Sequence, residues 1–226
     1  MKIIKVSQSD DRANWLELRR GVVTATKAKN VQPPKRGTGI PQGIYELLAE
    51  KVAIAKDGEP EKDRGLRLEN EGLELTAKKY KIKLNLDPGM WLSDDGKLGV
   101  SPDASEDSKN PKFAAENKSL DSKNHLQAII NDWTAKKLPN YNPLDSLKIA
   151  TADYAAQAIQ YFVINPDLQI LYFGLYDDRI ALENVMHYVI EIERKDVAEY
   201  VDGQELYERD ALAKVDNMIK ILKEIK

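Results

Sequence analysis

Three residues in the middle of the chain have the types and spacing of a cation-binding catalytic site. Asp103 follows a proline in an acidic turn, and Glu116 and Lys118 stand two residues apart in the segment AENKS. Residues i and i+2 of a β-strand point to the same face, so this carboxylate and this ammonium group would lie side by side. Such a group suits a divalent cation and a water molecule that it activates. A surface ion pair beside an acidic loop is the alternative.

Glu69, in the segment LRLENEGLEL, is a fourth candidate because helical spacing puts it at the edge of an apolar stripe. That stripe comprises Leu66, Asn70, Leu73, Ala77 and Tyr80, and Leu68 and Leu75 lie on the other side, which would allow burial on both faces. A partly buried carboxylate costs free energy unless something compensates it. If the helix packs against the sheet, Glu69 could join the other two carboxylates around one cation, which would relieve their repulsion. The alternative is an ion pair with Arg64 or Arg67.

The composition limits the kind of metal that such a site would take. The 226 residues include no cysteine, and the two histidines, His125 and His187, are too few and too far apart to suggest a zinc site. Oxygen ligands therefore remain, and they point to Mg²⁺ or Mn²⁺. No apolar run has transmembrane length and the N-terminus lacks a signal peptide, so we expect a cytoplasmic protein with no membrane partner.

The charge distribution indicates where an anionic partner could bind. The net charge of −3 argues against a generic nucleic-acid coat, which would be strongly basic. Between Leu18 and Tyr45, however, the chain has no acidic residue. Its cations in this stretch are Arg19, Arg20, Lys27, Lys29, Lys35 and Arg36. They could form a phosphate-binding surface, with a solvated helix face as the alternative for Lys27 or Lys29.

The elements that must position these residues are predicted from periodicity and from turn residues. Helices are expected around 15–20, 24–30, 45–58, 64–80, 125–131 and 150–164, and from 196 onward. Strands are expected at 81–87, 96–103, 112–120, 168–176 and 187–193, with a polar loop containing Pro139 and Pro143. The order of elements predicts an α/β (α+β) fold, in which helices flank a central mixed sheet in a single domain over 1–226.

Five segments, taken in order, resemble the motifs of the phage lambda exonuclease family, a branch of the PD-(D/E)xK nuclease group. They are WLELRRGVVTATKAKNV, LRLENEGLEL, SPDA, ENK and YAAQAIQY, and the resemblance runs from about residue 15 to residue 201. It implies a restriction-endonuclease-like mixed sheet flanked by helices. It also implies a phage- or prophage-encoded protein that acts in the cytoplasm of a bacterial host.

The activity implied by this resemblance is that of a Mg²⁺-dependent 5′→3′ exonuclease. Such enzymes digest one strand of linear double-stranded DNA to 5′-mononucleotides and leave a 3′ single strand for a single-strand annealing protein in recombination. They are commonly homotrimeric rings around the DNA, which would let a chain of net charge −3 hold its substrate. The alternatives are a structure-specific or restriction-type endonuclease on the same fold, and a non-catalytic DNA-end-binding recombination protein.

The resemblance also assigns roles to individual residues. Glu69, Asp103 and Glu116, together with the backbone carbonyl of Asn117, would hold two Mg²⁺ ions, for which Mn²⁺ would substitute. Lys118 would orient the attacking water and help to deprotonate it. Four residues would grip a 5′-terminal phosphate, namely Arg19, Thr26, Ser101 and Gln157, and Lys35 and Arg36 would contact the DNA. On residue type alone, Ser101 could equally be a turn residue, Thr26 a helix residue bonded to its own backbone, and Gln157 a buried amide.

Three departures from the family pattern need structural answers. The turn reads SPDA where the family often has SPDG, so Ala104 must tolerate that backbone. The residue between the glutamate and the lysine is usually apolar, whereas Asn117 would point to the opposite face and need hydrogen-bond partners if buried. The spacing of the last motif leaves open whether Gln157 or Gln160 is the functional glutamine.

Overall fold

The computed structural model describes residues 42–53, 61–150 and 152–224 of the chain. Its helices are α3 (Gln42–Val52), α4 (Glu61–Tyr80), α5 (Ser122–Ala135), α6 (Pro143–Ala150), α7 (Ala152–Ile164), α8 (Glu183–Met186) and α9 (Arg194–Glu224). Its strands are β1 (Trp91–Leu92), β2 (Gly99–Val100), β3 (Ala104–Ser105), β4 (Phe113–Lys118), β5 (Ile170–Tyr176) and β6 (His187–Glu193). The helices predicted around 15–20 and 24–30 lie outside the described residues.

Within this part of the chain, a four-stranded sheet has the order β3-β4-β5-β6. Strands β4 and β5 are parallel, whereas the other two pairs are antiparallel. In the central pair, Glu116 lies opposite Phe173 and Lys118 lies opposite Leu175. The run ILYFGLY of β5 is almost entirely buried, as expected for a strand covered on both faces. This mixed sheet with helices on both faces confirms the predicted fold class.

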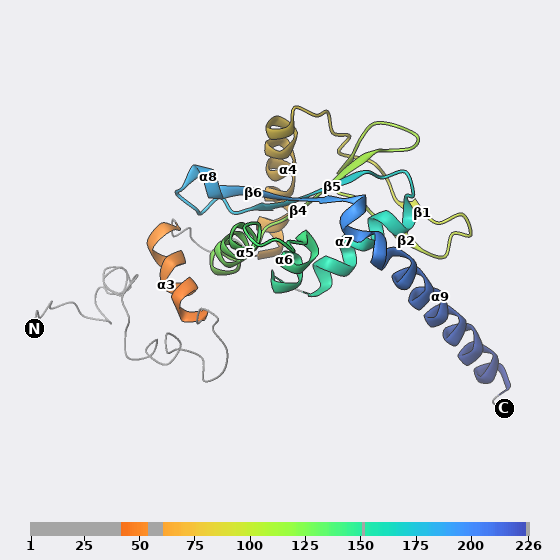
Figure 1. Cartoon of the computed structure of the whole chain (residues 1–226). Helices are drawn as coiled ribbons and strands as arrows, with labels where there is room; N and C mark the ends of the chain where they lie inside the picture. Colours follow the sequence, from red (N-terminus) through yellow and green to blue (C-terminus); the bar gives the residue numbers. More distant parts are fainter. Residues whose placement is uncertain (1–41, 54–60, 151, 225–226) are drawn as a thin grey trace, which may run out of the picture.

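Helices cover the sheet unequally on its two faces. Figure 1 shows α4 on one face and α5, α6 and α7 on the other, with α9 running away from the sheet beyond its packing against α7. Successive residues of β4 serve the two layers, because Ala114 joins the large core on the α7 side and Ala115 joins the smaller core on the α4 side. Even-numbered residues of β4 therefore face α7, and odd-numbered residues face α4.

Helix α7 matches its predicted span closely and ends at Ile164, two residues before Pro166, which cannot continue a helix. Its residues Ala158, Tyr161 and Phe162 are fully or almost fully buried. The helix packs against α6 and α9 as well as against the sheet, which fixes its rotation about its own axis. Side chains four residues apart on α7 consequently point to the same part of β4.

The strand predicted at 81–87 is wrong, because this segment makes only an isolated bridge between Asn85 and Ser105. Ile82 and Leu84 alternate with lysines, as in a strand, but they pack on the small core beneath α4. The side chain of Asn85 then accepts a hydrogen bond from the backbone of Asp87, which favours a turn over a ladder. The apolar alternation meets strand β3 at this one bridge, so no regular ladder forms.

Two further predictions, a strand at 96–103 and a loop containing Pro143, differ from the structure. Of the strand predicted at 96–103, only Gly99–Val100 pairs, and its partner is β1, which the sequence did not predict. Pro143 begins α6 and is not a loop residue, since proline is well suited to a first helical position. Helix α5 begins and ends beyond the span expected for it, and α9 begins slightly earlier than expected, at Arg194, whereas β6 has the predicted limits.

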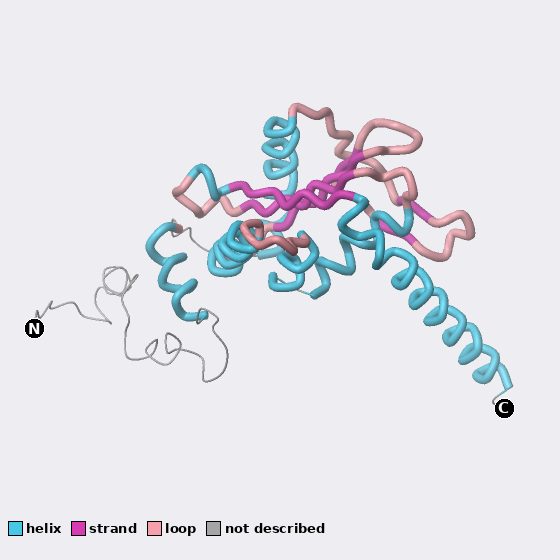
Figure 2. The backbone as a smooth tube through the Cα atoms, viewed as in Figure 1, coloured by secondary structure: helices cyan, strands magenta, loops and turns pink. Residues whose placement is uncertain are grey.

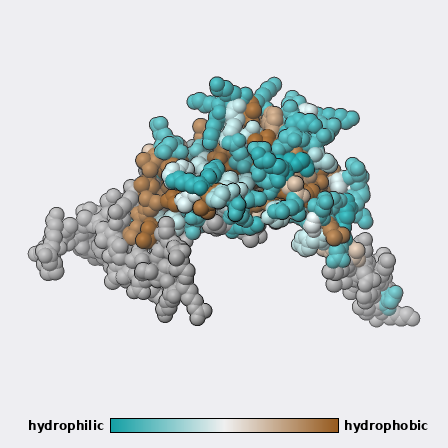
Figure 3. All heavy atoms as spheres, in the orientation of Figure 1, coloured by the Kyte–Doolittle hydropathy of each residue, from teal (hydrophilic) through white to brown (hydrophobic). Residues whose placement is uncertain are grey.

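Helix α4 buries only part of the stripe expected for it, together with residues on the Leu68 side. Asn70 is exposed, whereas Leu68, Gly72, Leu73 and Thr76 are buried against the sheet. The true stripe is rotated because it must accommodate β4 and β5 at close range. Figure 2 shows how much of the described chain is helical, and no described helix combines the length and the apolar character needed to cross a membrane. In the view of Figure 3, the surface over the α4 side of the sheet is mainly hydrophilic.

Candidate active site

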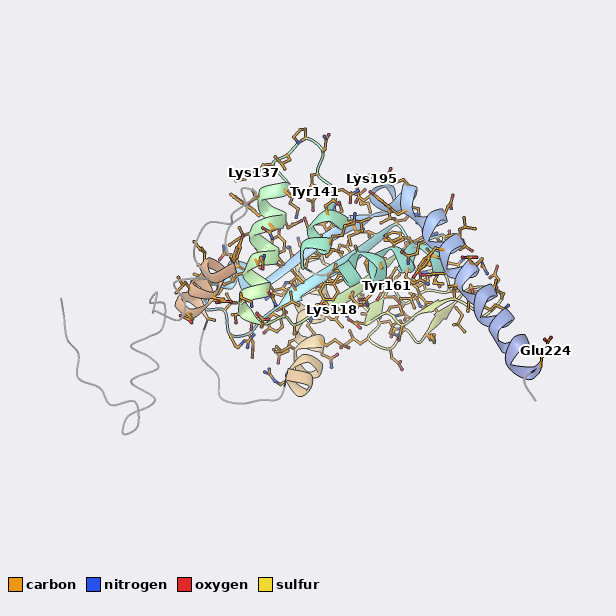
Figure 4. The ribbon with its side chains drawn as sticks, turned by 90° about the horizontal axis from the view of Figure 1, so that it is seen from below. Lys118, Lys137, Tyr141, Tyr161, Lys195 and Glu224 are labelled. Atoms are coloured by element: carbon orange, nitrogen blue, oxygen red, sulfur yellow. The ribbon has the colours of Figure 1, made fainter. Side chains whose placement is uncertain are left out.

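Glu116 is a carboxylate buried in the central strand β4, with 1% of its surface exposed. One oxygen, Oε1, accepts hydrogen bonds from the Lys118 ammonium group and from Gln157 Nε2, the latter at 2.6 Å. The other oxygen, Oε2, accepts from the Tyr161 hydroxyl. Strand spacing thus places Glu116 beside Lys118, as the sequence predicts, and α7 supplies the remaining donors. Figure 4 labels Lys118 and Tyr161 near each other beneath the sheet.

Asp103 lies beside this carboxylate, in the turn between β2 and β3. Its Oδ2 accepts a hydrogen bond of 2.8 Å from the backbone N–H of Asn117. Burial, and then the negative charges of Glu116 and Glu69, raise the pKa of Asp103 to about 7. Asp103 is therefore within electrostatic reach of both other predicted acidic residues, and a cation placed beside it would relieve the repulsion.

These carboxylates do not converge as a set of three. Among residues 42–53, 61–150 and 152–224, no group of three or more histidine, cysteine, aspartate or glutamate side chains is placed to hold a metal ion. The physical reason is that Glu116 turns toward donors on α7, whereas Glu69 projects from α4 on the other face of the sheet. Arg67, a predicted alternative partner for Glu69, pairs with Glu71 and Asp178.

The residues present nevertheless fit a cation held by oxygen atoms. The N–H and C=O groups of one strand residue point to the same side of the strand, so the Asn117 carbonyl faces the side on which Asp103 lies. Asp103 and Glu116 contribute a repelling pair of carboxylates beside it. This donor set consists only of hard oxygen ligands, which are those that Mg²⁺ prefers.

Lys118 is charged at neutral pH. Burial alone would lower the pKa of its amine, but Glu116 and Asp103 outweigh burial and the pKa is raised. The ammonium group also lies 5.9 Å from the centre of the Tyr154 ring. A protonated lysine cannot take a proton from water; it can only stabilise negative charge and orient a ligand by donating hydrogen bonds.

The two glutamines of the last motif have different surroundings. Gln157 binds Glu116, whereas Gln160 Oε1 accepts a hydrogen bond of 2.8 Å from Gln204 Nε2 on α9. Gln157 therefore lies at the carboxylates and Gln160 lies at a helix–helix contact. Tyr161 is the site residue that sequence reasoning missed. Tyr161 lies four residues after Gln157 on a predicted helix, and residues four apart share a helix face. This spacing could have indicated that both side chains reach the same site.

The remaining predicted residues divide between exposed and undescribed positions. Ser101 is exposed, two residues before Asp103. Ala104 is fully buried in β3 opposite Ala115 and has no positive φ, so the turn does not require glycine there. The predicted phosphate and DNA contacts Arg19, Thr26, Lys35 and Arg36 lie outside the described residues and stay predictions.

Comparison with known proteins supports the fold assignment. No protein-family model and no curated protein matches the sequence. Among solved structures, an alkaline exonuclease, LHK-Exo from Laribacter hongkongensis, matches at a TM-score of 0.54 and 21% identity, covering 93% of this chain and 95% of that one. LHK-Exo in complex with dAMP matches at a TM-score of 0.53 and 20% identity, with the same coverage. At this level of identity the similarity is one of fold, and the described part of this chain shares its fold with this alkaline exonuclease.

Proposed function

We propose that this protein is a metal-dependent deoxyribonuclease, and specifically a 5′→3′ exonuclease acting on linear double-stranded DNA. The observation that carries the proposal is the buried Glu116, held by Lys118, Gln157 and Tyr161 next to Asp103. A buried carboxylate with this many donors and a second carboxylate beside it is a costly arrangement, and such costs concentrate at functional sites. The fold shared with an alkaline exonuclease supports the same reading.

The residues divide the proposed chemistry among themselves. Asp103, Glu116 and the Asn117 carbonyl would hold Mg²⁺, or Mn²⁺ in its place, with Glu69 approaching from α4. When bound, the cations, two in our proposal, supply a Lewis acid for the phosphate and lower the pKa of the attacking water. The Lys118 ammonium group would donate a hydrogen bond to that water and stabilise the negative charge that develops on the phosphate oxygens. Gln157 and Tyr161 fix the carboxylate of Glu116 in one orientation.

The polarity and the end preference rest on the sequence resemblance, with partial support from the site. An amide nitrogen carries two N–H groups, and Gln157 uses one of them on Glu116, so the second is available for a terminal phosphate. Arg19 would supply the charge, with Thr26 and Ser101 as further donors. LHK-Exo has been solved with dAMP, a nucleoside monophosphate of the kind that an exonuclease releases. We further propose a homotrimer that hands its 3′ single strand to an annealing protein.

A duplex labelled at one end tests this function against its rivals. With Mg²⁺, we expect loss of a 5′ label as mononucleotide at once, while a 3′ label on the same molecule persists, and we expect covalently closed circular duplex to stay intact. Nicking of the circle would favour the endonuclease on the same fold. Binding of duplex ends without any hydrolysis, in Mg²⁺ or Mn²⁺, would favour the non-catalytic end-binding protein.

A further inference from the structure

Asn117 connects the turn that carries Asp103 with helix α4, which carries Glu69. Its backbone N–H donates to Asp103, as described above, and its side chain points to the opposite face of β4, toward α4. There its Nδ2 donates a hydrogen bond of 3.3 Å to the backbone carbonyl of Leu68, the residue directly before Glu69. One residue thus contacts both the turn of Asp103 and the segment of α4 that presents Glu69.

Glycines on both neighbouring elements make room for this amide. A Cβ atom added to Gly72 of α4 would overlap with the Asn117 amide group, and one added to Gly174 of β5 would come within 2.9 Å of Asn117 Oδ1. Glycine inside a helix costs about 1 kcal/mol relative to alanine. The close fit to Asn117 explains why α4 carries glycine at a position where alanine would otherwise be better.

The polar side chain is an expensive choice at this position. Asn117 is only 5% exposed, and its Oδ1 has no hydrogen-bond partner among the residues that the structure describes. A buried acceptor left unpaired costs about 1–3 kcal/mol, which an apolar side chain of similar volume would avoid. The single hydrogen bond from Nδ2 to Leu68 does not by itself recover that cost, so packing alone does not account for asparagine here.

We propose that the Asn117 side chain is a positioning residue that sets the height of α4 above β4 at Glu69, and through it the affinity of the site for a divalent cation. Its bond to the Leu68 carbonyl fixes the backbone next to Glu69, and its volume between the two glycines keeps helix and strand at one separation. This inference rests on the proposed metal-dependent function. Groups that orient metal ligands typically change metal affinity 10- to 100-fold when they are removed.

The test is direct titration of Mn²⁺ by calorimetry in the absence of DNA, so that it does not depend on activity. Asn117→Leu keeps the branched shape of the side chain, with larger methyl groups at its end, but removes the hydrogen bond, and we expect Mn²⁺ to bind at least about tenfold more weakly. The matched control is Asn142→Leu. Asn142 also donates from Nδ2 to a backbone carbonyl on another helix, that of Asp196 at 3.0 Å, and lies outside the carboxylate hydrogen bonds. The variant Asn142→Leu should lower the melting temperature and leave Mn²⁺ affinity unchanged.

A second pair of variants separates positioning from simple packing. Gly72→Ala alone should destabilise the fold and weaken Mn²⁺ binding, because its Cβ competes with the amide for the same space. Combining it with Asn117→Ala removes the overlap, so the loss of thermal stability should be smaller than the sum of the two single losses. Mn²⁺ affinity should stay low in the double variant because the bond to Leu68 is absent. If the double variant recovered both Mn²⁺ affinity and thermal stability, Asn117 would have a packing role only.

The outcomes keep this inference distinct from the proposed function. If the wild type binds Mn²⁺ and Asn117→Leu binds it equally well, the positioning role is wrong and the nuclease proposal stands. If the wild type neither binds Mn²⁺ nor cleaves DNA with it, the proposed function fails and the inference fails with it. If Asn117→Leu does not fold, the single variant Asn117→Ala takes its place in the same titration, with the same expected weakening and the same contrary result.

Discussion

Replacing Tyr161 with phenylalanine removes one hydroxyl from the proposed active site and little else. The ring packs edge-on against Trp91, with centroids 6.1 Å apart, and phenylalanine preserves that contact. The hydroxyl donates to Glu116 Oε2, and both side chains are buried, at 0% and 1% exposure. A hydrogen bond to a charged group contributes about 1.5–3 kcal/mol. If the whole of it serves to hold Glu116 in its reactive orientation, the chemical step should slow about 10- to 150-fold.

The assay is a single-turnover digestion of linear duplex in Mg²⁺, which separates the chemical step from product release. The chain offers a matched control in Tyr80, whose hydroxyl also donates to a glutamate, Glu191 Oε1 at 2.7 Å, on an exposed edge of the sheet. Tyr80→Phe should leave the rate unchanged. A folded Tyr161→Phe variant that cleaves as fast as Tyr80→Phe would refute the idea that the phenol orients Glu116.

Further variants test other parts of the structure. Lys118→Ala should lower the single-turnover rate by about 10²- to 10³-fold, the usual loss for one charge-stabilising donor, with Mn²⁺ affinity by calorimetry nearly retained. Gln157→Ala should slow digestion by about tenfold or more, whereas Gln160→Ala should change thermal stability and not rate, because its amide contacts α9. Burial, and to a smaller extent the charge of Lys79, lower the pKa of His187 from 6.5 to about 4. The His187 imidazole therefore binds a proton less readily in the folded state than in the unfolded state. The stability contributed by His187 is present above pH 6.5 and is lost as the pH falls toward 4. Asp103, whose pKa is raised, changes stability in the opposite direction over the same range, so the variant His187→Gln is the reference. Between pH 7 and pH 5, urea unfolding should show the wild type losing about 2 kcal/mol relative to His187→Gln.

The local patterns predicted the elements that carry the chemistry. The segment around Glu116 and Lys118 begins with apolar residues and was predicted to be a strand. It forms β4, with Glu116 and Lys118 on the same face of the strand as predicted. The run from 187 to 193 alternates clearly and became β6 with the predicted limits. In both cases the neighbouring strand lies where the pattern requires one, so local preference and tertiary packing agree.

Contacts between distant segments could not be predicted from local patterns. The segment 81–87 alternates as well as β6 does, yet it meets the neighbouring strand β3 only in the bridge between Asn85 and Ser105 and is otherwise irregular. The role of Tyr161 was not predicted, since nothing local shows that its hydroxyl meets a carboxylate 45 residues away. The rotation of α4, which exposes Asn70 and buries Leu68, follows from the glycine contacts with Asn117.

Mg²⁺-dependent release of acid-soluble nucleotides from linear duplex DNA, measured for the wild type and for Asp103→Asn and Glu116→Gln, tests the proposed site most directly. Both substitutions keep the shape of the side chain and remove its negative charge, so the fold should survive and can be checked by circular dichroism. We expect the wild type to release nucleotides only while Mg²⁺ is present and to stop when EDTA is added. We expect both variants to fall to background, and wild-type release by either folded variant would contradict the assignment of these carboxylates to catalysis.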